Sequence, residues 1–364
     1  MIIIKKKEFQ VLALNPFHGG SHKSFVESWI EKSQHSWTLL TLPGSQWKWR
    51  LQFAAVEFLA EIRKLYEDGQ RWDLIFCSSM MNIAEFRGLA PFLSDIPLVA
   101  YFHENQLTYP ESRHHKFDLN LCMININSAL AADAVWFNSD FHRKDFLKAA
   151  RHLLNQKPGK PVAVVDQIAS KSTVQHQAIA DDFFCAREVA LQSPLKLVWA
   201  ARWEEDKNPS LLFAALRELK EKNFLFKISI LGEQLTRWPE CFQEAEDEFA
   251  SEIDHFGYAE SREQYKAILQ EGDIFISTAD HEFFGIAAVE ALAAGCLPIV
   301  PDSLAYPDVL AGFEDFFYKP GCVKSLVQQI ETASRANGLC CSEKMQKYFW
   351  SKRVLELDDA LVLI

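Results

Sequence analysis

The sequence lacks the long apolar segments that are typical of membrane proteins. None of its 364 residues lies in a run of roughly 18 uninterrupted apolar residues, the length that a membrane-spanning helix requires. The apolar start Met1–Ile4 is followed directly by charged residues and by no small-residue cleavage site, which is not the pattern of a signal peptide. We therefore expect a cytoplasmic protein without stable membrane association.

The sequence is also poor in paired cysteines and in positive charge. Its eight cysteines form no C-x-x-C pair and most lie in apolar runs, so we expect buried, reduced thiols and no zinc site. The net charge of -11 argues against broad, nonspecific nucleic-acid binding, but it is compatible with a local basic patch. The sequence contains no G-x-G-x-x-G motif and no P-loop motif, so it gives no specific support for a nicotinamide-binding fold or a P-loop kinase.

What the sequence does contain is an alternation of apolar strands with amphipathic helices, at the spacing of β-α-β units. The length exceeds that of one ordinary core, and 49% hydrophobic residues supply material for two. The predicted fold class is α/β, with two Rossmann-like, doubly wound parallel-sheet domains that face a central cleft. Ligands of such sheets bind at the carboxyl ends of the strands.

The alternation breaks once, which sets the predicted domain boundaries. Residues 1–160 form the first domain and residues 195–340 the second. Between them, residues 161–194 are predicted as a linker that contains one strand, Val162–Val165. Residues 341–364 are predicted as a C-terminal helix that crosses back to the first domain.

One predicted β-α-β unit carries two carboxylates eight residues apart. Glu282 lies in the loop after an apolar strand, and Glu290 lies in the Ala-rich helix predicted at Gly285–Ala294. The helical neighbours of Glu290 are almost all apolar, so its charge requires a partner or a ligand. The alternative is a capping carboxylate at the start of the helix, followed by a solvated one.

Polar clusters follow two strands of the first predicted domain. Gly19-Gly20 lies between a strand and a helix, where the backbone can approach an anion, although a plain turn fits equally well. His103-Glu104-Asn105-Gln106 directly follows the predicted strand Pro97–Phe102. A lone histidine there more often caps the next segment, but four polar residues after a buried strand indicate a site.

In the second predicted domain, Arg202 follows a strand and Lys207 precedes a helix. Two cations at a helix N-terminus suit a diphosphate. The alternative is a surface ion-pair cluster with the acidic residues between them, Glu204, Glu205 and Asp206. Gly232 and Tyr258 follow two further strands and could line a pocket or form turns.

These motifs resemble those of known enzymes. The stretch Glu282–Pro298 resembles the Glu-x7-Glu motif of retaining GT-B glycosyltransferases of family 4, and Arg202 with Lys207 is similar to the pair that holds the nucleotide-sugar diphosphate there. The stretches Leu14–Phe25 and Tyr101–Pro110 resemble signatures of the tRNA-queuosine α-mannosyltransferases. That family implies GDP-mannose as donor and the queuosine of tRNA-Asp as acceptor.

The resemblance also implies roles for individual residues. Glu282 would contact the hexose hydroxyls and Glu290 the ribose hydroxyls, while Arg202 and Lys207 would stabilise the leaving diphosphate and His103 would lie near the sugar. It implies front-face attack with an oxocarbenium-like transition state. No Asp-x-Asp follows a strand, which fits transfer without a metal or other cofactor. The expected donor-binding residues are Gly19, Gly20, Arg202, Lys207, Gly232, Tyr258, Glu282, Phe283, Phe284, Gly285 and Glu290.

A tRNA acceptor requires a local basic patch. Three segments are candidates, each of which could instead be a solvated face: Lys5–Lys7, Arg113–Lys116 and the helix that bears Arg143, Lys144, Lys148, Arg151 and His152. Trp47 and Trp49 could stack on an unpaired base, although core packing suits at least one of them. The expected acceptor-binding residues are His18, His22, Lys23, Glu104, Asn105, Arg113, Lys116, Arg143 and Lys144.

Three other interpretations stay open at this point. The first is a family 4 enzyme with a lipid or saccharide acceptor. The second is a noncatalytic nucleotide-sugar-binding or RNA-binding module, which the presence of Glu282, Arg202 and Lys207 disfavours. The third is a sugar-phosphate epimerase, which shares the two-domain fold.

Overall fold

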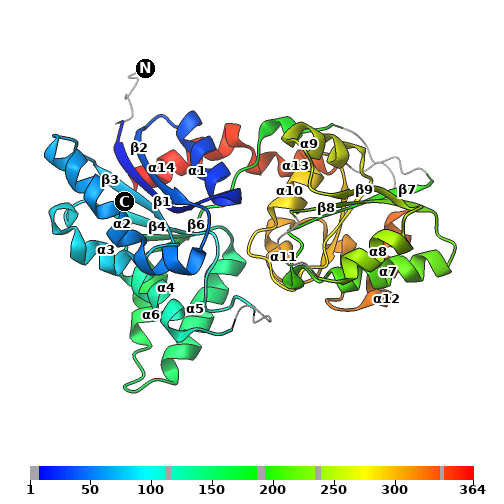
Figure 1. Ribbon diagram of the computed structural model, residues 1–364, viewed down its shortest axis with the longest axis horizontal. Helices are drawn as coiled ribbons and strands as arrows, with labels where there is room; N and C mark the ends of the chain where they lie inside the picture. The colour runs from blue at the N-terminus through cyan, green and yellow to red at the C-terminus, as the bar shows by residue number, and fades with distance from the viewer. Residues whose placement is uncertain (1–7, 111–115, 187–192, 234–238, 337–339) are drawn as a thin grey trace. The chain divides into compact units, whose positions relative to one another are not determined.

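The computed structural model describes residues 8–110, 116–186, 193–233, 239–336 and 340–364 (Figure 1). The chain divides into two compact units. The first unit runs to Ala178 and includes Trp350–Ile364, and the second is Ile179–Phe349. The chain therefore leaves the first unit once and returns to it at its end.

The first unit is built on a parallel sheet with the strand order β2-β1-β3-β4-β5-β6. Its strands are β1 (Gln10–His18), β2 (Ser36–Pro43), β3 (Leu74–Ser78), β4 (Leu98–Phe102), β5 (Ala134–Phe137) and β6 (Ser172–Val174). Its helices are α1 (Gly20–Lys32), α2 (Trp47–Glu67), α3 (Ile83–Leu89), α4 (Leu119–Ala131), α5 (Asp140–Asn155), α6 (Ala163–Ser170) and α14 (Trp350–Val362), with a 3-10 turn at Pro91–Leu93.

Both faces of this sheet are covered, as a doubly wound fold requires. Helices α2 to α6 bury their apolar sides in one core with residues such as Phe58, Phe86 and Phe146. Helices α1 and α14 pack side by side on the other face (Figure 1). There the carboxylate of Asp358 accepts hydrogen bonds from Trp29 Nε1, Ser33 Oγ and the Gln34 amide, each at 2.8 Å. These bonds fasten the C-terminal helix to α1.

The second unit is built on a parallel sheet with the strand order β12-β11-β10-β7-β8-β9. Its strands are β7 (Leu195–Ala200), β8 (Phe226–Leu231), β9 (Ile253–Gly257), β10 (Ile274–Ile276), β11 (Leu297–Pro301) and β12 (Phe317–Tyr318). Its helices are α7 (Pro209–Glu221), α8 (Cys241–Glu248), α9 (Arg262–Glu271), α10 (Ile286–Ala293), α11 (Tyr306–Val309), α12 (Val323–Ala333) and α13 (Ser342–Met345). Its 3-10 turns are η2 (Asp181–Phe183), η3 (Glu205–Lys207), η4 (Glu314–Phe316) and η5 (Gln346–Tyr348).

The predicted α/β class with two parallel sheets is confirmed, but the segment assigned to a linker is different. The strand predicted at Val162–Val165 is wrong, because helix α6 occupies Ala163–Ser170 and buries Val165 and Ile168 one turn apart. Strand β6 follows and pairs with β5. Residues 161–178 therefore belong to the first unit. The segment 341–364 is also not one helix, because extended backbone at Phe349 separates η5 from α14.

The eight cysteines differ in their burial. All eight cysteines are free thiols, and Cys77, Cys122, Cys296 and Cys341 are buried. Within the described residues, no helix is both long and apolar enough to cross a membrane.

Candidate active site

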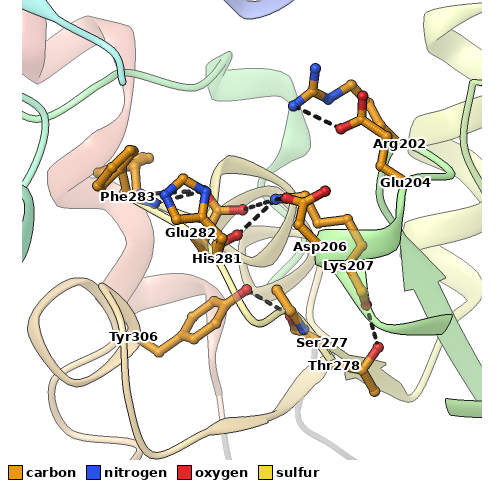
Figure 2. Close-up of polar contacts among 12 residues, drawn as sticks. Arg202, Glu204, Asp206, Lys207, Ser277, Thr278, His281, Glu282, Phe283 and Tyr306 are labelled. Atoms are coloured by element: carbon orange, nitrogen blue, oxygen red, sulfur yellow. Dashed lines mark hydrogen bonds and ion pairs between the residues drawn. The ribbon is translucent and has the colours of Figure 1, made fainter. Parts of the chain in front are cut away.

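A partly buried ion pair between Lys207 and Glu282 lies at the carboxyl ends of β7 and β10 in the second unit. The Lys207 ammonium donates to the His281 carbonyl at 2.9 Å and pairs with Asp206 at 3.3 Å and with Glu282 at 3.5 Å (Figure 2). The side chain of Lys207 is only 12% exposed. The two residues, which are 75 positions apart in the sequence, are thus brought together by the fold.

The turn that carries Lys207 is held against the loop that carries Glu282. The Lys207 carbonyl accepts a hydrogen bond from Thr278 Oγ1 at 2.8 Å, and the Asp280 amide donates to the Asp206 carbonyl at 2.8 Å. Asn208 then caps α7 by accepting from the Leu211 amide, and Pro209 begins that helix. Asn208 and Pro209 therefore end the turn η3 directly after Lys207, beside the loop that carries Glu282.

The charges of this pair stabilise each other. Burial lowers the pKa of Lys207, but the carboxylates of Glu282 and Asp206 outweigh it, so the pKa is raised overall. Burial likewise raises the pKa of Glu282, but Lys207 and the backbone amides that follow lower it overall. Two of those amides, of Phe283 and Phe284, donate to Glu282 Oε1 at 3.1 and 3.3 Å. Both groups are therefore charged at neutral pH.

A cavity adjoins the pair at the start of α10. Its lining includes Lys207, Glu282, Ser277, Gly285 and Tyr306. The hydroxyls of Tyr306 and Ser277 are hydrogen-bonded at 2.6 Å (Figure 2). Gly285 has a φ of 83°, and a Cβ there would lie 2.9 Å from Tyr306 Cε1. A larger residue at position 285 would therefore strain the turn between Glu282 and α10.

Arg202 occupies the rim of this region rather than its interior. Its guanidinium pairs with Glu204 at 3.1 Å, and its side chain is 50% exposed (Figure 2). Burial raises the pKa of Glu204, although Arg202 acts in the opposite direction. The ion-pair cluster suggested by the sequence thus exists for Glu204 and Asp206, and Lys207 adds the contact with Glu282.

Glu290 has protein partners of its own on α9. Its Oε2 accepts a hydrogen bond from the Tyr265 hydroxyl at 3.0 Å, and Arg262 lies 4.0 Å from its Oε1. Burial raises the pKa of Glu290 to about 7, against the opposing effects of Arg262 and Tyr265. Glu290 therefore contacts α9, whereas Glu282 contacts η3.

The other residues predicted to bind the donor in this unit differ in their accessibility. The rings of Phe283 and Phe284 are buried and contact His281 and Tyr348, so only their amides face Glu282. Gly232 follows β8, next to Ala201. Tyr258 follows β9 and is 70% exposed.

In the first unit, the Gly19-Gly20 turn joins β1 directly to α1. Gly19 is the residue before the helix, and Gly20 begins it with a φ of 50°. The turn packs on Gly44, where a Cβ would lie 2.7 Å from Gly19 Cα. Gly44 was not predicted as part of the site. It is recognised only because the fold places it directly against Gly19.

A buried network surrounds His103 at the carboxyl end of β4. The Gln177 amide donates to His103 Nδ1 at 2.7 Å, which places the ring proton on Nε2. The ring of His22 packs against it with centroids 4.1 Å apart. Burial, followed by the neighbouring His22 and His142, lowers the pKa of His103 well below its usual range, so the ring is neutral.

Asn138 completes this network from the end of β5. Its Nδ2 donates to the His103 carbonyl at 2.9 Å, and its Oδ1 lies 2.7 Å from His142 Nδ1. Asn138 directly follows a strand, the same signal that pointed to His103, so the sequence could have indicated it. Gln177 had no such signal, because it lies in the segment assigned to the linker.

The residues predicted to bind the acceptor are placed as follows. His18 accepts from Asn15 Nδ2 at 3.0 Å and pairs with Glu27, and Lys23 is exposed. Asn105 is fully buried and accepts from the Leu107 and Thr108 amides, so it shapes the loop, and the carbonyl of Glu104 accepts from Ser79. Arg143 and Lys144 both pair with Asp140, and Lys116 is exposed. Lys5–Lys7 and Arg113–His115 lie outside the described residues.

The two tryptophans of the sequence prediction are now distinguished. Trp47 packs against Leu51, Leu121 and Ile124. Trp49 is 47% exposed, and its ring centroid lies 4.6 Å from that of Phe53.

The described residues contain no group of three or more His, Cys, Asp or Glu side chains placed to hold a metal ion.

The class of the protein follows from the fold together with a matching family model. A sucrose-phosphate synthase from Thermosynechococcus elongatus has a similar fold, with a TM-score of 0.72 over 98% of this chain and 99% of that one. Anabaena HepE in complex with UDP and glucose matches over 98% and 100%, with a TM-score of 0.65. Identities of 13% and 14% show likeness of fold alone. Residues 186–348 match the group 1 glycosyl transferases. The chain is a GT-B glycosyltransferase.

The first unit gives the particular family. Residues 10–179 match the N-terminal model of the tRNA-queuosine alpha-mannosyltransferases. The tRNA-queuosine alpha-mannosyltransferase of Drosophila melanogaster is 37% identical over 310 residues, which cover 82% of this chain and 81% of that protein. The chain belongs to the tRNA-queuosine alpha-mannosyltransferase family, and the resemblance found in its sequence motifs is confirmed.

Proposed function

We propose that this chain transfers mannose from GDP-mannose to the queuosine nucleoside of tRNA-Asp, with retention of the anomeric configuration. The observation that carries the glycosyl-transfer part of the proposal is the partly buried Lys207–Glu282 pair beside the half-exposed Arg202. The name of the Drosophila relative supports the acceptor. A GDP-mannose:cellobiosyl-diphosphopolyprenol alpha-mannosyltransferase of Xanthomonas oryzae, 50% identical over 42 residues and 12% of this chain, supports the donor.

In this proposal, Lys207 and Arg202 stabilise the diphosphate as its negative charge grows in the transition state. Such stabilisation is largest where the charges are fixed in advance and shielded from water. Lys207 meets this condition, because Glu282 and Asp206 keep it charged although it is buried. The two cations supply the positive charge that a divalent ion would otherwise provide, and on that ground we propose transfer without a metal.

The two carboxylates are proposed to hold the sugar nucleotide at different points. The following amides bind Glu282 Oε1, so its Oε2, on the side of Lys207, is the oxygen available to accept from hexose hydroxyls. Glu290 is proposed to accept hydrogen bonds from the ribose hydroxyls, with Tyr265 orienting its carboxylate. No side chain is assigned as a nucleophile, in keeping with front-face attack.

His103 is the proposed contact of the transferred sugar in the first unit. Its neutral ring carries the proton on Nε2, so the ring can donate a hydrogen bond to a sugar hydroxyl. Its backbone carbonyl, which already accepts from Asn138, keeps a second lone pair. That lone pair can face the positive charge that develops at the anomeric carbon.

The donor and the stereochemistry are tested together. The protein is incubated with tRNA-Asp that contains queuosine and, in separate reactions, with GDP-mannose, GDP-glucose, UDP-glucose or UDP-galactose. The expected product is a single hexose on queuosine, formed from GDP-mannose, with an α linkage by NMR. A β linkage would refute retention, and transfer from a UDP-sugar in preference to GDP-mannose would refute the proposed donor.

A further inference from the structure

The surface formed by α5 and the turn that follows it is basic, although the chain as a whole is acidic. Residues 140–162 contain six Lys and Arg residues and only two carboxylates, Asp140 and Asp145. The net charge of the whole chain is -11. Positive charge is therefore concentrated on this part of the first unit.

The charges follow one side of α5. Lys144, Lys148, Arg151 and Asn155 recur at intervals of four, three and four residues, which places them on one helical face. From first to last they span about 16 Å of helix. Lys148 and Arg151 are exposed, and Lys157 and Lys160 continue the series in the turn.

A groove lies along the far end of this face. It is lined by Lys148, Arg151, His152, Asn155 and Val162, so it offers several hydrogen-bond donors. Arg151 also pairs with Asp166 at 2.5 Å, but both side chains are about half exposed or more, and exposed pairs are weak. The guanidinium keeps donors for a second anion. The groove lies about one to three turns beyond Arg143 and Lys144, which pair with Asp140.

We propose that this basic face, defined as Lys144, Lys148, Arg151, His152, Lys157 and Lys160, docks the phosphate backbone of the tRNA acceptor. The proposal rests on the proposed function, and it names the surface that holds the acceptor away from the reacting nucleoside. In double-stranded DNA, the phosphates of one strand are spaced about 3.4 Å apart along the axis, and an RNA backbone likewise presents closely spaced phosphates. The cations Lys144, Lys148 and Arg151 span about 10 Å of α5, which is comparable with the separation of a few successive phosphates.

The surface fits RNA better than an anionic membrane. A helix that binds a membrane surface inserts an exposed apolar face. The apolar side of α5, with Phe146, Ala150 and Leu154, is instead buried in the core of the first unit. Among the described residues, none of the exposed large apolar side chains lies in α5 or α6. The exposed side chains of α5 are Lys144, Lys148, Arg151, His152 and Asn155, which suits a phosphate backbone.

The test compares two triple variants that change the total charge equally. The first is Lys148→Glu, Arg151→Glu and Lys157→Glu, in the basic face. The control is Lys64→Glu, Lys324→Glu and Lys352→Glu, three exposed lysines on α2, α12 and α14. The Kd for queuosine-containing tRNA-Asp is measured across a salt series, and KM and kcat are measured for tRNA and for GDP-mannose.

We expect the first variant to bind tRNA at least tenfold more weakly than the control. Its plot of log Kd against log salt should be shallower by about 2 to 3, because each phosphate contact contributes about 0.7 to 0.9. The KM for tRNA should rise, while kcat and the KM for GDP-mannose stay close to the wild-type values. Lys148→Ala with Lys157→Ala, which keeps the Arg151–Asp166 pair, should show a smaller loss in the same direction.

The failures are distinguishable. If the wild-type protein glycosylates tRNA and the first variant matches the control, the surface is wrong and the proposed function stands. If the wild-type protein neither binds nor glycosylates tRNA, both proposals are wrong. If wild-type protein binds phosphatidylglycerol vesicles and the first variant loses that binding but keeps tRNA binding, the surface is a membrane surface instead.

Discussion

Replacing Lys207 by methionine removes a cation that pairs with the carboxylates of Asp206 and Glu282. Lys207 is 12% exposed, and Glu282 is 27% exposed, so neither group is well solvated. Breaking a buried pair by removing one partner costs about 3 to 5 kcal/mol. Because Glu282 keeps some access to water, we expect the lower end, a loss of about 3 kcal/mol in the free energy of unfolding at neutral pH.

The pH dependence gives this prediction a sign. The folded pKa of Glu282 lies below 4.5 and that of Lys207 above 10.5, so their contribution is complete between those values. It is lost as the pH falls below 4.5 through the pKa of Glu282, or rises above 10.5 through the pKa of Lys207. In Lys207→Met, Glu282 loses the charge that contributes most to lowering its pKa, so the pKa of Glu282 should be higher than in wild type. The difference in the free energy of unfolding between wild type and Lys207→Met should therefore become smaller as the pH falls below neutral.

The assay combines urea denaturation with steady-state kinetics. Lys196→Met is the matched control, because Lys196 pairs with Glu271 at 3.4 Å with 47% and 71% of the side chains exposed. That exposed pair should cost less than about 1 kcal/mol. For Lys207→Met, kcat should fall about 100- to 1,000-fold, the usual loss of one transition-state charge contact. A folded Lys207→Met variant with wild-type kcat would refute the assigned role.

Three further predictions follow from buried polar groups. Burial raises the pKa of Glu290 to about 7, so between pH 4.5 and 7 the carboxyl is protonated in the folded protein and ionised in the unfolded chain. As the pH rises from 4.5 to 7, the free energy of unfolding of wild type should therefore fall by up to about 3 kcal/mol relative to that of Glu290→Gln, measured by urea denaturation. Gln177→Ala removes the donor to His103 Nδ1, which should cost about 1 to 2 kcal/mol and allow both ring tautomers, visible in the imidazole nitrogen NMR shifts; a single unchanged tautomer would contradict this. Asp358→Ala removes an acceptor of three hydrogen bonds and should cost about 3 kcal/mol in thermal unfolding, whereas the exposed neighbour, in Asp359→Ala, should cost less than about 0.5 kcal/mol; equal losses would contradict the account.

The fold could be predicted wherever apolar periodicity and local capping agree. The strand predicted at Pro97–Phe102 is β4, Leu98–Phe102, and the helix predicted at Gly285–Ala294 is α10, Ile286–Ala293. The prediction failed at Val162–Val165, where a run of β-branched residues favours a strand. There the spacing of Val165 and Ile168 allows both to enter the core beside α5, and this packing outweighs the local preference.

The site could be predicted where functional residues follow a strand. The resemblance to known enzymes implied that Lys207 and Glu282 share one site, and the fold places their charged groups 3.5 Å apart. The partners of Glu290 could not be predicted, because Tyr265 lies on another helix and only tertiary packing brings them together. The contact of Gln177 with His103 could not be predicted for the same reason, because nothing in the sequence around Gln177 indicates a contact with a residue 74 positions away.

The most direct test of the central claim is the fate of labelled mannose. Wild-type protein and Glu282→Gln are incubated with carbon-13 mannose-labelled GDP-mannose and tRNA-Asp, prepared with either queuosine or guanosine at the modified position. Digested nucleosides are then analysed by mass spectrometry. The account predicts label on queuosine alone, with wild-type protein, and a large loss in Glu282→Gln. Label on guanosine-containing tRNA, or full activity in Glu282→Gln, would contradict it.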